Sequence, residues 1–506
     1  MIFNNLGRNI SVNFKLFTFF LIPLGIIYFY GLDFLSFNVK ERYYVLSVLT
    51  LSFGFPIVLY LIFSFFKDIN KAFILLICLL PLVPSVGFYL RALGSELGSE
   101  LLSVALELII ILLFFISIHL VQKTKHSKSL LIFCFLWFLA NTISLLLSEN
   151  ILISFPSYLL SVSLILFAIS LSAFVNGDGV QSNIDKRLDL TLRTYVLSVS
   201  VFAIACMSLI FLNFGFGFLS SVFSLFRITL ESYPGLMTNN LLSSVLIISI
   251  PIWVTLLSNN FNQKGFLRSL LTLFIFCVSI LLIFLDKSRG AFIVLIFYLV
   301  IFILRFLLSS LANPKNQFRN QSYLMSFTII VILALGFIFL GEVVVNRMTG
   351  LNTGQFSFKD IIETTFLSAR GLTITQGFQE FLNSPFFGKG YGNGLMYIPT
   401  FGIFLDSHNL IIEHLVATGI FGITPIFYLL VSAFLSSVKS RRKLTSHDKD
   451  LIFSLWLSIA GFFLFGVTSG SEFIAAYAIK TAYCSYTLLL FLIAIMTITE
   501  NRRKFR

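Results

Sequence analysis

His408 is the clearest candidate for acid–base chemistry, because it stands in the run Asp406-Ser407-His408-Asn409 directly before a long apolar block. At about 100° per residue, a continuous helix would place Gly419 about 20° and Gly422 about 40° from His408, on a shared face. Small residues on that face let another helix approach, so the imidazole would point into the protein. A positive helix N-terminus favours a neutral imidazole, which can accept a proton. The pattern indicates a general base, with a capping or anchoring histidine as the alternative.

Arg289 is the second candidate, in the run Asp286-Lys287-Ser288-Arg289-Gly290 at the start of another apolar block. A helix N-terminus carries about half a positive charge and free backbone N–H groups. A guanidinium beside it would complete an anion site, and phosphate is the anion that fits best. The alternative is that Arg289 is an interfacial anchor whose side chain extends toward water.

A glycine-rich run, residues 384–394, lies between these two helix starts, with glycine at every second position after Phe387. Such a run permits positive φ and close approach of the backbone to a ligand, although ordinary turns use the same residues. Lys389 lies inside the run, and Arg370 precedes it in Ser368-Ala369-Arg370-Gly371. Both are further cations that could contact an anionic substrate.

Membrane-spanning helices are the elements that must position these residues. Of the 506 residues, 58% are hydrophobic and 11% are charged, which cannot provide the polar surface of a soluble globule. The apolar residues form blocks of about 20, the helical length that crosses a hydrocarbon core of about 30 Å. Strands of an outer-membrane barrel would instead alternate over about ten residues. The sequence therefore predicts an all-α, polytopic transmembrane helix bundle of about 12 to 14 spans. The predicted spans are residues 15–32, 43–66, 71–90, 101–122, 129–147, 152–174, 194–218, 236–258, 268–285, 290–311, 323–342, 408–437, 450–470 and 474–496.

Lysine and arginine residues cluster in alternate connections between the blocks, which is the pattern of cytoplasmic loops. The clusters are Lys67 and Lys71; Lys123, Lys125 and Lys128; Lys186, Arg187 and Arg193; Lys264 and Arg268; Lys315 and Arg319; Lys439, Arg441, Arg442 and Lys443; and Arg502, Arg503, Lys504 and Arg506. All fall on the side of the N-terminus, so both termini are predicted to be cytoplasmic. This topology accounts for the net charge of +13, and no nucleic-acid partner is expected. The first apolar block lacks a cleavage signature and is interpreted as a retained span.

Residues 343–407 form the one long connection predicted on the non-cytoplasmic side. Loops of this length in compact folds are usually functional or disordered, and the many aromatic residues here argue against disorder. Apolar residues recur at helical spacing between Lys359 and Leu382, which predicts one or two amphipathic helices that could cover a cavity. We therefore divide the chain into transmembrane helices 1–342, an extracytoplasmic loop 343–407, and C-terminal helices with a basic tail 408–506.

Taken together, these motifs resemble the O-antigen ligase and O-antigen polymerase superfamily of bacterial membrane glycan transferases. The strongest match is His408-Asn409, then nine residues, then Gly419-Ile420-Phe421-Gly422. Further matches are Ser288-Arg289-Gly290, and Arg370 ahead of the run from Pro385 to Gly392. A weaker match is Arg227 followed by Gly235 and Asn239-Asn240-Leu241. By motif, the resemblance covers about residues 220 to 440.

The resemblance implies transfer of a glycan from an undecaprenyl diphosphate carrier to an acceptor hydroxyl at the outer face of the bacterial cytoplasmic membrane. The acceptor would be lipid A core in a ligase or a second lipid-linked glycan in a polymerase. His408, Arg289 and Arg370 would be catalytic, as the base and the diphosphate clamp of one inverting displacement. The implied substrate-binding residues are Arg227, Asn240, Ser288, Lys389 and Asn409. No metal and no cofactor is expected, and the five cysteines lie singly in apolar blocks without ligand spacing.

Two alternatives remain open from the sequence. Ligase and polymerase share these motifs, and capsule or exopolysaccharide assembly and protein glycosylation use similar donors. From a different class, a lipid-linked oligosaccharide flippase would also have many spans. A flippase should place ionisable residues at mid-membrane depth and often has two similar halves. Here the notable charges lie at outward helix ends and in one loop, which favours the transferase.

Overall fold

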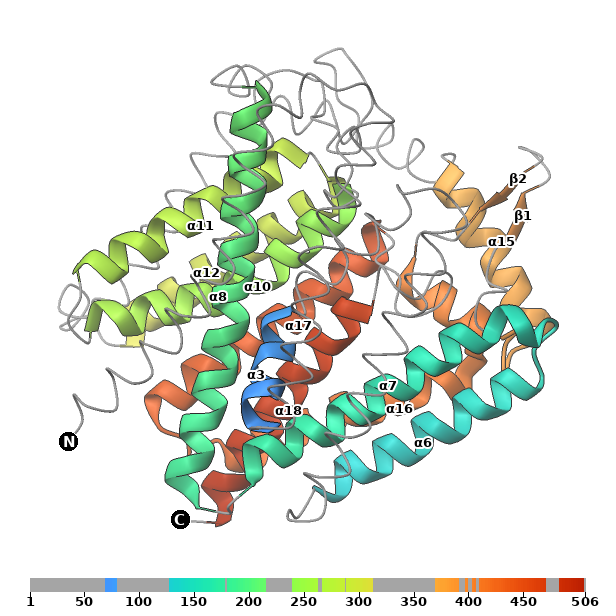
Figure 1. Ribbon diagram of the computed structural model, residues 1–506, viewed down its shortest axis with the longest axis horizontal. Helices are drawn as coiled ribbons and strands as arrows, with labels where there is room; N and C mark the ends of the chain where they lie inside the picture. The colour runs from blue at the N-terminus through green and yellow to red at the C-terminus, as the bar shows by residue number, and fades with distance from the viewer. Residues whose placement is uncertain are drawn as a thin grey trace.

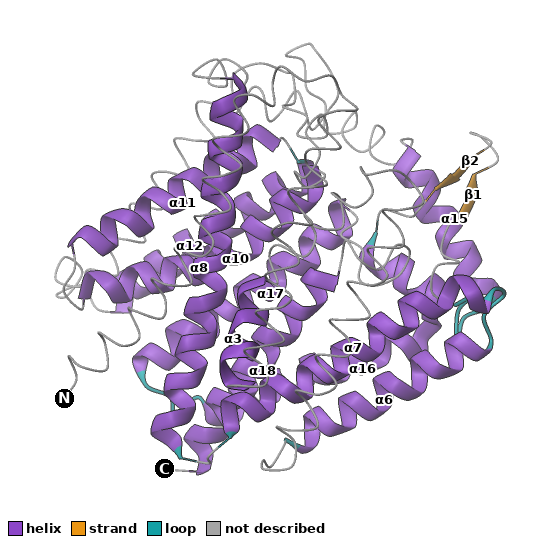
Figure 2. Cartoon of the chain, in the orientation of Figure 1, coloured by secondary structure: helices purple, strands orange, loops and turns teal. Residues whose placement is uncertain are grey.

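The computed structural model describes residues 69–79, 127–177, 180–214, 239–262, 266–286, 288–312, 369–390, 396–398, 403–405, 409–469 and 482–504. Almost all of these residues are helical, and Figure 2 shows the single small hairpin that accompanies them. The elements are α3 (Ile69–Leu79), α6 (Lys128–Leu146), α7 (Ile151–Asn176), α8 (Gln181–Phe214), α10 (Asn239–Asn262), α11 (Phe266–Asp286), α12 (Arg289–Ala312), α15 (Ala369–Asn383), β1 (Met396–Ile398), β2 (Ile403–Leu405), α16 (Leu410–Ser440), α17 (Ser446–Ser469) and α18 (Ala482–Lys504).

Most of the described helices coincide with predicted apolar blocks, as burial of apolar surface requires. Within the described residues, four helices are long and apolar enough to cross a membrane: Lys128–Leu146, Tyr158–Asn176, Leu410–Ser440 and Ser446–Thr468. Shorter apolar helices occupy Ser243–Thr255, Leu273–Leu285 and Gly290–Arg305. The predicted spans before residue 69, at 101–122 and at 323–342 lie outside the described residues, so the total of about 12 to 14 stays a prediction.

Two helices extend beyond their predicted spans into basic segments. α8 begins at Gln181 rather than near residue 194, and α18 ends at Lys504 rather than near 496. In α8, Arg193 Nε pairs with Asp189 Oδ2 one turn earlier at 2.7 Å. In α18, Arg503 Nε donates to Ser440 Oγ of α16 at 2.7 Å. The charged residues therefore find partners that let the helices continue past the apolar blocks.

The helices pack into one apolar core that runs through the described bundle. α16 contacts α6, α18, α15 and α17, while α10 contacts α17, α11, α12 and α8 (Figure 1). The largest fully buried side chains are Trp137, Trp253, Tyr195, Tyr298, Phe73, Phe167, Phe276, Phe292 and Phe462. Large apolar side chains on the outer faces of α6 and α16 are instead exposed, including Phe135, Phe138, Phe427, Val431 and Phe434. Exposed apolar faces of this extent suit contact with lipid rather than with water.

One end of the bundle gathers the basic helix ends, and we call it the basic end: the starts of α6, α8 and α17 with the ends of α16 and α18. Ser127 Oγ donates to Glu500 Oε1 at 2.6 Å. Arg502 pairs with Asp448 at 2.9 Å and with Asp185 at 3.2 Å. These contacts hold together chain segments that the charge pattern predicts on one side of the membrane. Which side this is remains a prediction.

Candidate active site

The packing of α12 against α17 shows at which end of the bundle the predicted anion site lies. Arg305 of α12 forms an ion pair with Asp450 near the start of α17. Farther along, Gly461 of α17 packs against the ring of Tyr298. Residue numbers fall along α12 as they rise along α17, so the two helices are antiparallel. The start of α12 at Arg289 therefore lies level with the end of α17 at Ser469, at the opposite end from the basic end.

Asn409 places the start of α16 at this same end. It is the N-cap residue of α16, and its Oδ1 accepts from the backbone N–H groups of Ile411 at 3.1 Å and Ile412 at 3.2 Å. Its Nδ2 donates to the carbonyl of Val467 near the end of α17 at 3.3 Å. The starts of α12 and α16 therefore both lie at the same end of α17. The Asn409 amide, predicted to bind substrate, is used here to cap α16.

Ser288 directly precedes α12 and is buried, at 3% exposure. Its carbonyl accepts from the backbone N–H of Phe292 at 3.1 Å, so the helix begins beside it as the sequence predicts. The backbones of Arg289, Arg370 and Asn240 lie in the first turns of α12, α15 and α10, whereas their side chains are outside the described part of the structure. His408, Arg227 and the run 391–395 lie outside the described residues altogether. The roles assigned to these side chains stay predictions.

α16 is broken at Gly419, which corrects the prediction of one continuous helical face. Gly419 has φ 64° and ψ −165°, outside the helical region. The rotation of about 100° per residue therefore does not carry past this point, so one continuous helical face does not extend to Gly422. His408 lies outside the described residues, so its orientation stays a prediction. The physical reason is that glycine tolerates positive φ without a steric penalty, so it lets the chain leave the helix and resume it.

The turn that follows α15, Ser384–Gly390, fills this break with backbone hydrogen bonds; we call it the 384–390 turn. The N–H groups of Lys389 and Gly390 donate to the carbonyls of Val416 and Ala417, both at 2.9 Å. In return, the N–H groups of Ile420 and Phe421 donate to the carbonyls of Pro385 at 2.9 Å and Phe386 at 3.1 Å.

In an unbroken helix, the N–H groups of Ile420 and Phe421 would donate to the carbonyls of Val416 and Ala417. The 384–390 turn replaces both partners. Its N–H groups donate to the carbonyls of α16, and its carbonyls, which lie four residues earlier in the turn, accept from the N–H groups of α16. We call the arrangement the crossed pairing. Each buried backbone group left unpaired would cost about 1 to 3 kcal/mol, so the exchange removes most of the cost of the break.

Two glycines allow the backbones to approach this closely. Gly388 has φ 67°, and a Cβ atom there would lie 2.4 Å from the carbonyl carbon of Ala417. A Cβ atom at Gly419 would lie 2.3 Å from the carbonyl carbon of Phe386. Any larger residue at either position would combine an unfavourable φ with a collision against backbone. Gly388 of the run and Gly419 of the motif therefore serve a backbone contact.

His414 supports the break from inside. It is 2% exposed, and its Nε2 lies 3.1 Å from the carbonyl oxygen of Gly422 beyond the break. Its ring stacks on Trp137 of α6, with centroids 5.8 Å apart and planes at 10°. From the same face of α6, Ser144 Oγ donates to the carbonyl of Ala417 at 3.0 Å. His414 is thus a buried contact residue of the break and not a neutral position on α16.

Lys389 is held by two carboxylates. Its Nζ lies 2.5 Å from Glu380 Oε2 in α15 and 3.8 Å from Glu149 Oε1 in the connection between α6 and α7. The hydrogen bond from Lys389 is the largest influence that lowers the pKa of the Glu380 carboxyl. Glu149 N also donates to the Lys389 carbonyl at 3.4 Å. An anionic substrate that bound Lys389 would have to compete with these carboxylates, so here Lys389 ties α15 to α6 and α7.

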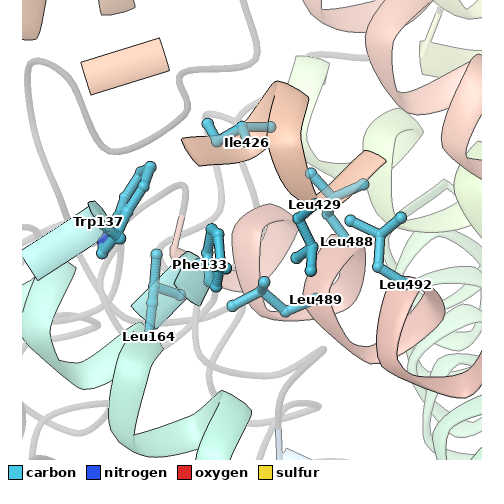
Figure 3. A pocket seen from close by; sticks show the side chains of 8 residues that line it. All are labelled: Phe133, Trp137, Leu164, Ile426, Leu429, Leu488, Leu489 and Leu492. Atoms are coloured by element: carbon cyan, nitrogen blue, oxygen red, sulfur yellow. The ribbon is translucent and has the colours of Figure 1, made fainter. Parts of the chain in front are cut away.

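An apolar cavity lies between α6, α7, α16 and α18, on the side of the break toward the basic end. Figure 3 shows its eight hydrophobic lining side chains: Phe133, Trp137, Leu164, Ile426, Leu429, Leu488, Leu489 and Leu492. Its lining has no polar group that could orient a reacting atom.

The sequence reasoning found the two helix starts but missed the crossed pairing and the ties made by His414 and Lys389. One signal for the pairing was present: the alternate glycines of the run and the glycine pair of the motif are both positions where backbones can meet. A helix was also predicted within residues 359–382, and α15 at Ala369–Asn383 is found there, with Gly371, Thr373 and Gly377 buried.

Residues 273–427 match the family model described as O-antigen ligase. The match supports the O-antigen ligase superfamily, as the motifs predicted, and it spans the starts of α12, α15 and α16 together with the crossed pairing. Arg227 and Asn240 lie outside it. No curated protein matches the chain.

Proposed function

We propose that this membrane protein of the O-antigen ligase superfamily transfers a glycan from an undecaprenyl diphosphate carrier to an acceptor hydroxyl, as a metal-independent, inverting glycosyltransferase. The observation that carries the proposal is the family match over residues 273–427, which includes both polar helix starts. Both starts lie at the same end of α17, where an amphiphilic donor could present its headgroup while its lipid stays in the bilayer. The predicted outward orientation puts this end at the outer face of the cytoplasmic membrane.

In the proposed reaction, the imidazole of His408 accepts the proton of the acceptor hydroxyl as the oxygen attacks the anomeric carbon. A bond forms between the acceptor oxygen and that carbon, and the bond from the carbon to the phosphate oxygen breaks. The bonding pair leaves on the diphosphate, and the configuration at the carbon inverts. Asn409 supports this role because it fixes where α16 begins, immediately after His408.

The leaving diphosphate gains negative charge, which Arg289 and Arg370 would stabilise. A guanidinium donates two parallel hydrogen bonds to a phosphate, and the N-terminus of α12 adds its partial positive charge. Ser288, Asn240 and Arg227 remain proposed donor contacts. Lys389 would contact the headgroup of the donor if the donor displaces Glu380 or Glu149 from its ammonium group.

The test is a transfer assay with purified protein in liposomes, supplied with undecaprenyl diphosphate-linked glycan and an acceptor. We expect transfer by the wild-type protein and a fall of about 10² to 10⁴-fold in His408→Ala, the usual range for loss of a positioned base. The level and membrane insertion of His408→Ala should stay near normal, since a residue at the wet end of a span contributes little to insertion. Transfer at the wild-type rate by His408→Ala would refute the base assignment.

The acceptor is proposed to be lipid A core, as in a ligase, with a second lipid-linked glycan, as in a polymerase, as the other outcome. Deletion of the gene followed by glycan analysis separates the two. Full-length chains that accumulate on the carrier indicate a ligase, whereas single-repeat products indicate a polymerase. Reconstituted protein that moves lipid-linked glycan across liposomes without joining it to any acceptor would replace both with a flippase.

A further inference from the structure

We infer that the crossed pairing between the 384–390 turn and the break in α16 positions the candidate active site, with Gly388, Gly419 and His414 as its positioning residues. The inference rests on the proposed function, because the groups that it would position are those proposed to carry the transfer. These three residues themselves touch no substrate.

The pairing joins the two helices whose first residues belong to the candidate site. The 384–390 turn ends α15, the helix that begins at Ala369-Arg370. The break at Gly419 ends the first segment of α16, the helix capped by Asn409 directly after His408. Four backbone hydrogen bonds of 2.9 to 3.1 Å join the turn to the break. The end of α15 and the first segment of α16 are therefore fixed against each other by main-chain hydrogen bonds.

His414 and α6 anchor this unit to the rest of the bundle. The Gly422 carbonyl can only accept, so His414 must carry its proton on Nε2 and donate across the break. The stacked Trp137 ring is held in turn by its Nε1, which donates to the carbonyl of Ser161 in α7 at 3.1 Å. Ser144 adds a hydrogen bond to Ala417. These contacts therefore hold α16 against α6 and α7 on both sides of the break.

Such rigidity matters because a displacement of about 1 Å between reacting groups can lower a rate by about 100-fold. If the pairing positions the site, weakening it should lower kcat and leave the KM for the donor nearly unchanged. We expect at least a tenfold fall in kcat for Gly419→Ala, since a Cβ atom there collides with the Phe386 backbone. The kcat of His414→Leu should fall by a similar factor. The kcat of His414→Gln, which keeps an N–H donor, should fall less.

Gly177→Ala is the matched glycine control. It lies at the end of α7, and a Cβ atom there would meet chiefly the flexible end of the Arg187 side chain. Its kcat should stay within about twofold of wild type, since most surface changes are nearly neutral. A normal kcat in Gly419→Ala would overturn the inference.

Because Gly419→Ala could also disturb folding, a second experiment replaces the hydrogen bonds with a covalent tie. Phe387 of the turn and Phe421 of α16 stack with ring centroids 4.9 Å apart, and Phe421 N donates to the neighbouring Phe386 carbonyl. The double variant Phe387→Cys with Phe421→Cys should form a disulfide on oxidation, measured as the loss of two thiols to a maleimide reagent. Failure to crosslink would show that the two segments are not paired.

Activity is then compared between oxidised and reduced protein. With Gly419 present, oxidation should leave transfer within about twofold of the reduced protein, since the segments are already held together. With Gly419→Ala added, oxidation should raise transfer at least fivefold, because the disulfide restores the lost position. Loss of transfer on oxidation with Gly419 present would overturn the inference, since it would mean that the pairing opens during each cycle.

The crosslink is read without any substrate, so it separates this inference from the proposed function. If the crosslink forms but the wild-type protein transfers no glycan, the proposed function fails and the pairing itself stands. If the wild-type protein transfers glycan and Gly419→Ala does so equally well, the proposed function stands and the positioning role fails.

Discussion

The two ends of the bundle are held together by different kinds of contact. At the candidate active site, the 384–390 turn and α16 exchange main-chain hydrogen bonds, and glycine is required at two positions. At the basic end, side chains make the contacts: Arg502 with Asp448 and Asp185, and Arg503 with Ser436 and Ser440. Main-chain contacts fix position and depend little on pH or salt, whereas side-chain ion pairs can be exchanged one at a time. We therefore expect changes in the crossed pairing to affect mainly geometry and changes at the basic end to affect mainly stability, with the ion pairs of Lys389 adding a small stabilising contribution beside the pairing.

The largest effect that we expect is a loss of transfer activity when Arg289, at the start of α12, is changed. Arg289→Lys keeps the charge at the start of α12 but loses the paired hydrogen bonds of a guanidinium. Loss of one charged hydrogen bond of about 1.5 to 3 kcal/mol should lower transfer by an order of magnitude or more. The assay is the liposome transfer reaction, with thermal unfolding of the same sample expected to be unchanged.

Arg193→Lys is the control for that substitution, because Arg193 makes an exposed pair with Asp189 within α8 and should be neutral. Full activity in Arg289→Lys would show that Arg289 is an interfacial anchor and does not bind the diphosphate through paired hydrogen bonds.

At the basic end we expect an effect on stability alone. Asp448 caps α17 by accepting from Thr445 N at 3.0 Å, and it also pairs with Arg502. Asp448→Asn can keep the cap but loses the ion pair, so the free energy of unfolding should fall by about 1.5 to 3 kcal/mol. Unfolding in a denaturing detergent series would measure this. A matching loss of transfer per folded molecule would contradict the division between the two ends.

The smallest expected effect is a pH dependence in the tie between Lys389 and Glu380. Lys389 holds the pKa of the Glu380 carboxyl below its ordinary 4.5, so this pair stabilises the fold above that pH and stops doing so as pH falls through the lowered pKa. Glu380→Gln should therefore lower the free energy of unfolding by less than about 1 kcal/mol near pH 7. The difference from wild type should shrink toward zero below about pH 4.5. A difference that stays constant with pH would show that the lost charge is not its cause.

The sequence was sufficient for features that follow from apolar blocks and their polar edges. Seven predicted blocks coincide, to within four residues at each end, with the described helices α6, α7, α10, α11, α12, α16 and α17, because burial of apolar surface is visible residue by residue. The start of α12 at Arg289 was predicted because a run of polar residues directly precedes an apolar block. The hairpin of β1 and β2 was not predicted, since its strands have only three residues each.

Features that depend on a distant partner could not be predicted. Gly419 inside an apolar block is compatible with an intact helix, and it becomes a break only because the 384–390 turn supplies hydrogen bonds to its neighbours. Arg502 and Arg503 read as a cytoplasmic tail, but Asp448 and Ser440 draw them into the last turn of α18. The role of His414 could not be predicted, because its stacking partner Trp137 lies on another helix.

The crossed pairing also bears on how the protein is made. A broken helix that enters the bilayer with free carbonyls and N–H groups is penalised by several kcal/mol per group. Here the partners of Val416, Ala417, Ile420 and Phe421 all come from the 384–390 turn and from Ser144, which precede α16 in the chain. They are synthesised first and can be waiting when α16 leaves the ribosome. The order of the segments along the chain thus allows the break to be satisfied during insertion rather than repaired afterwards.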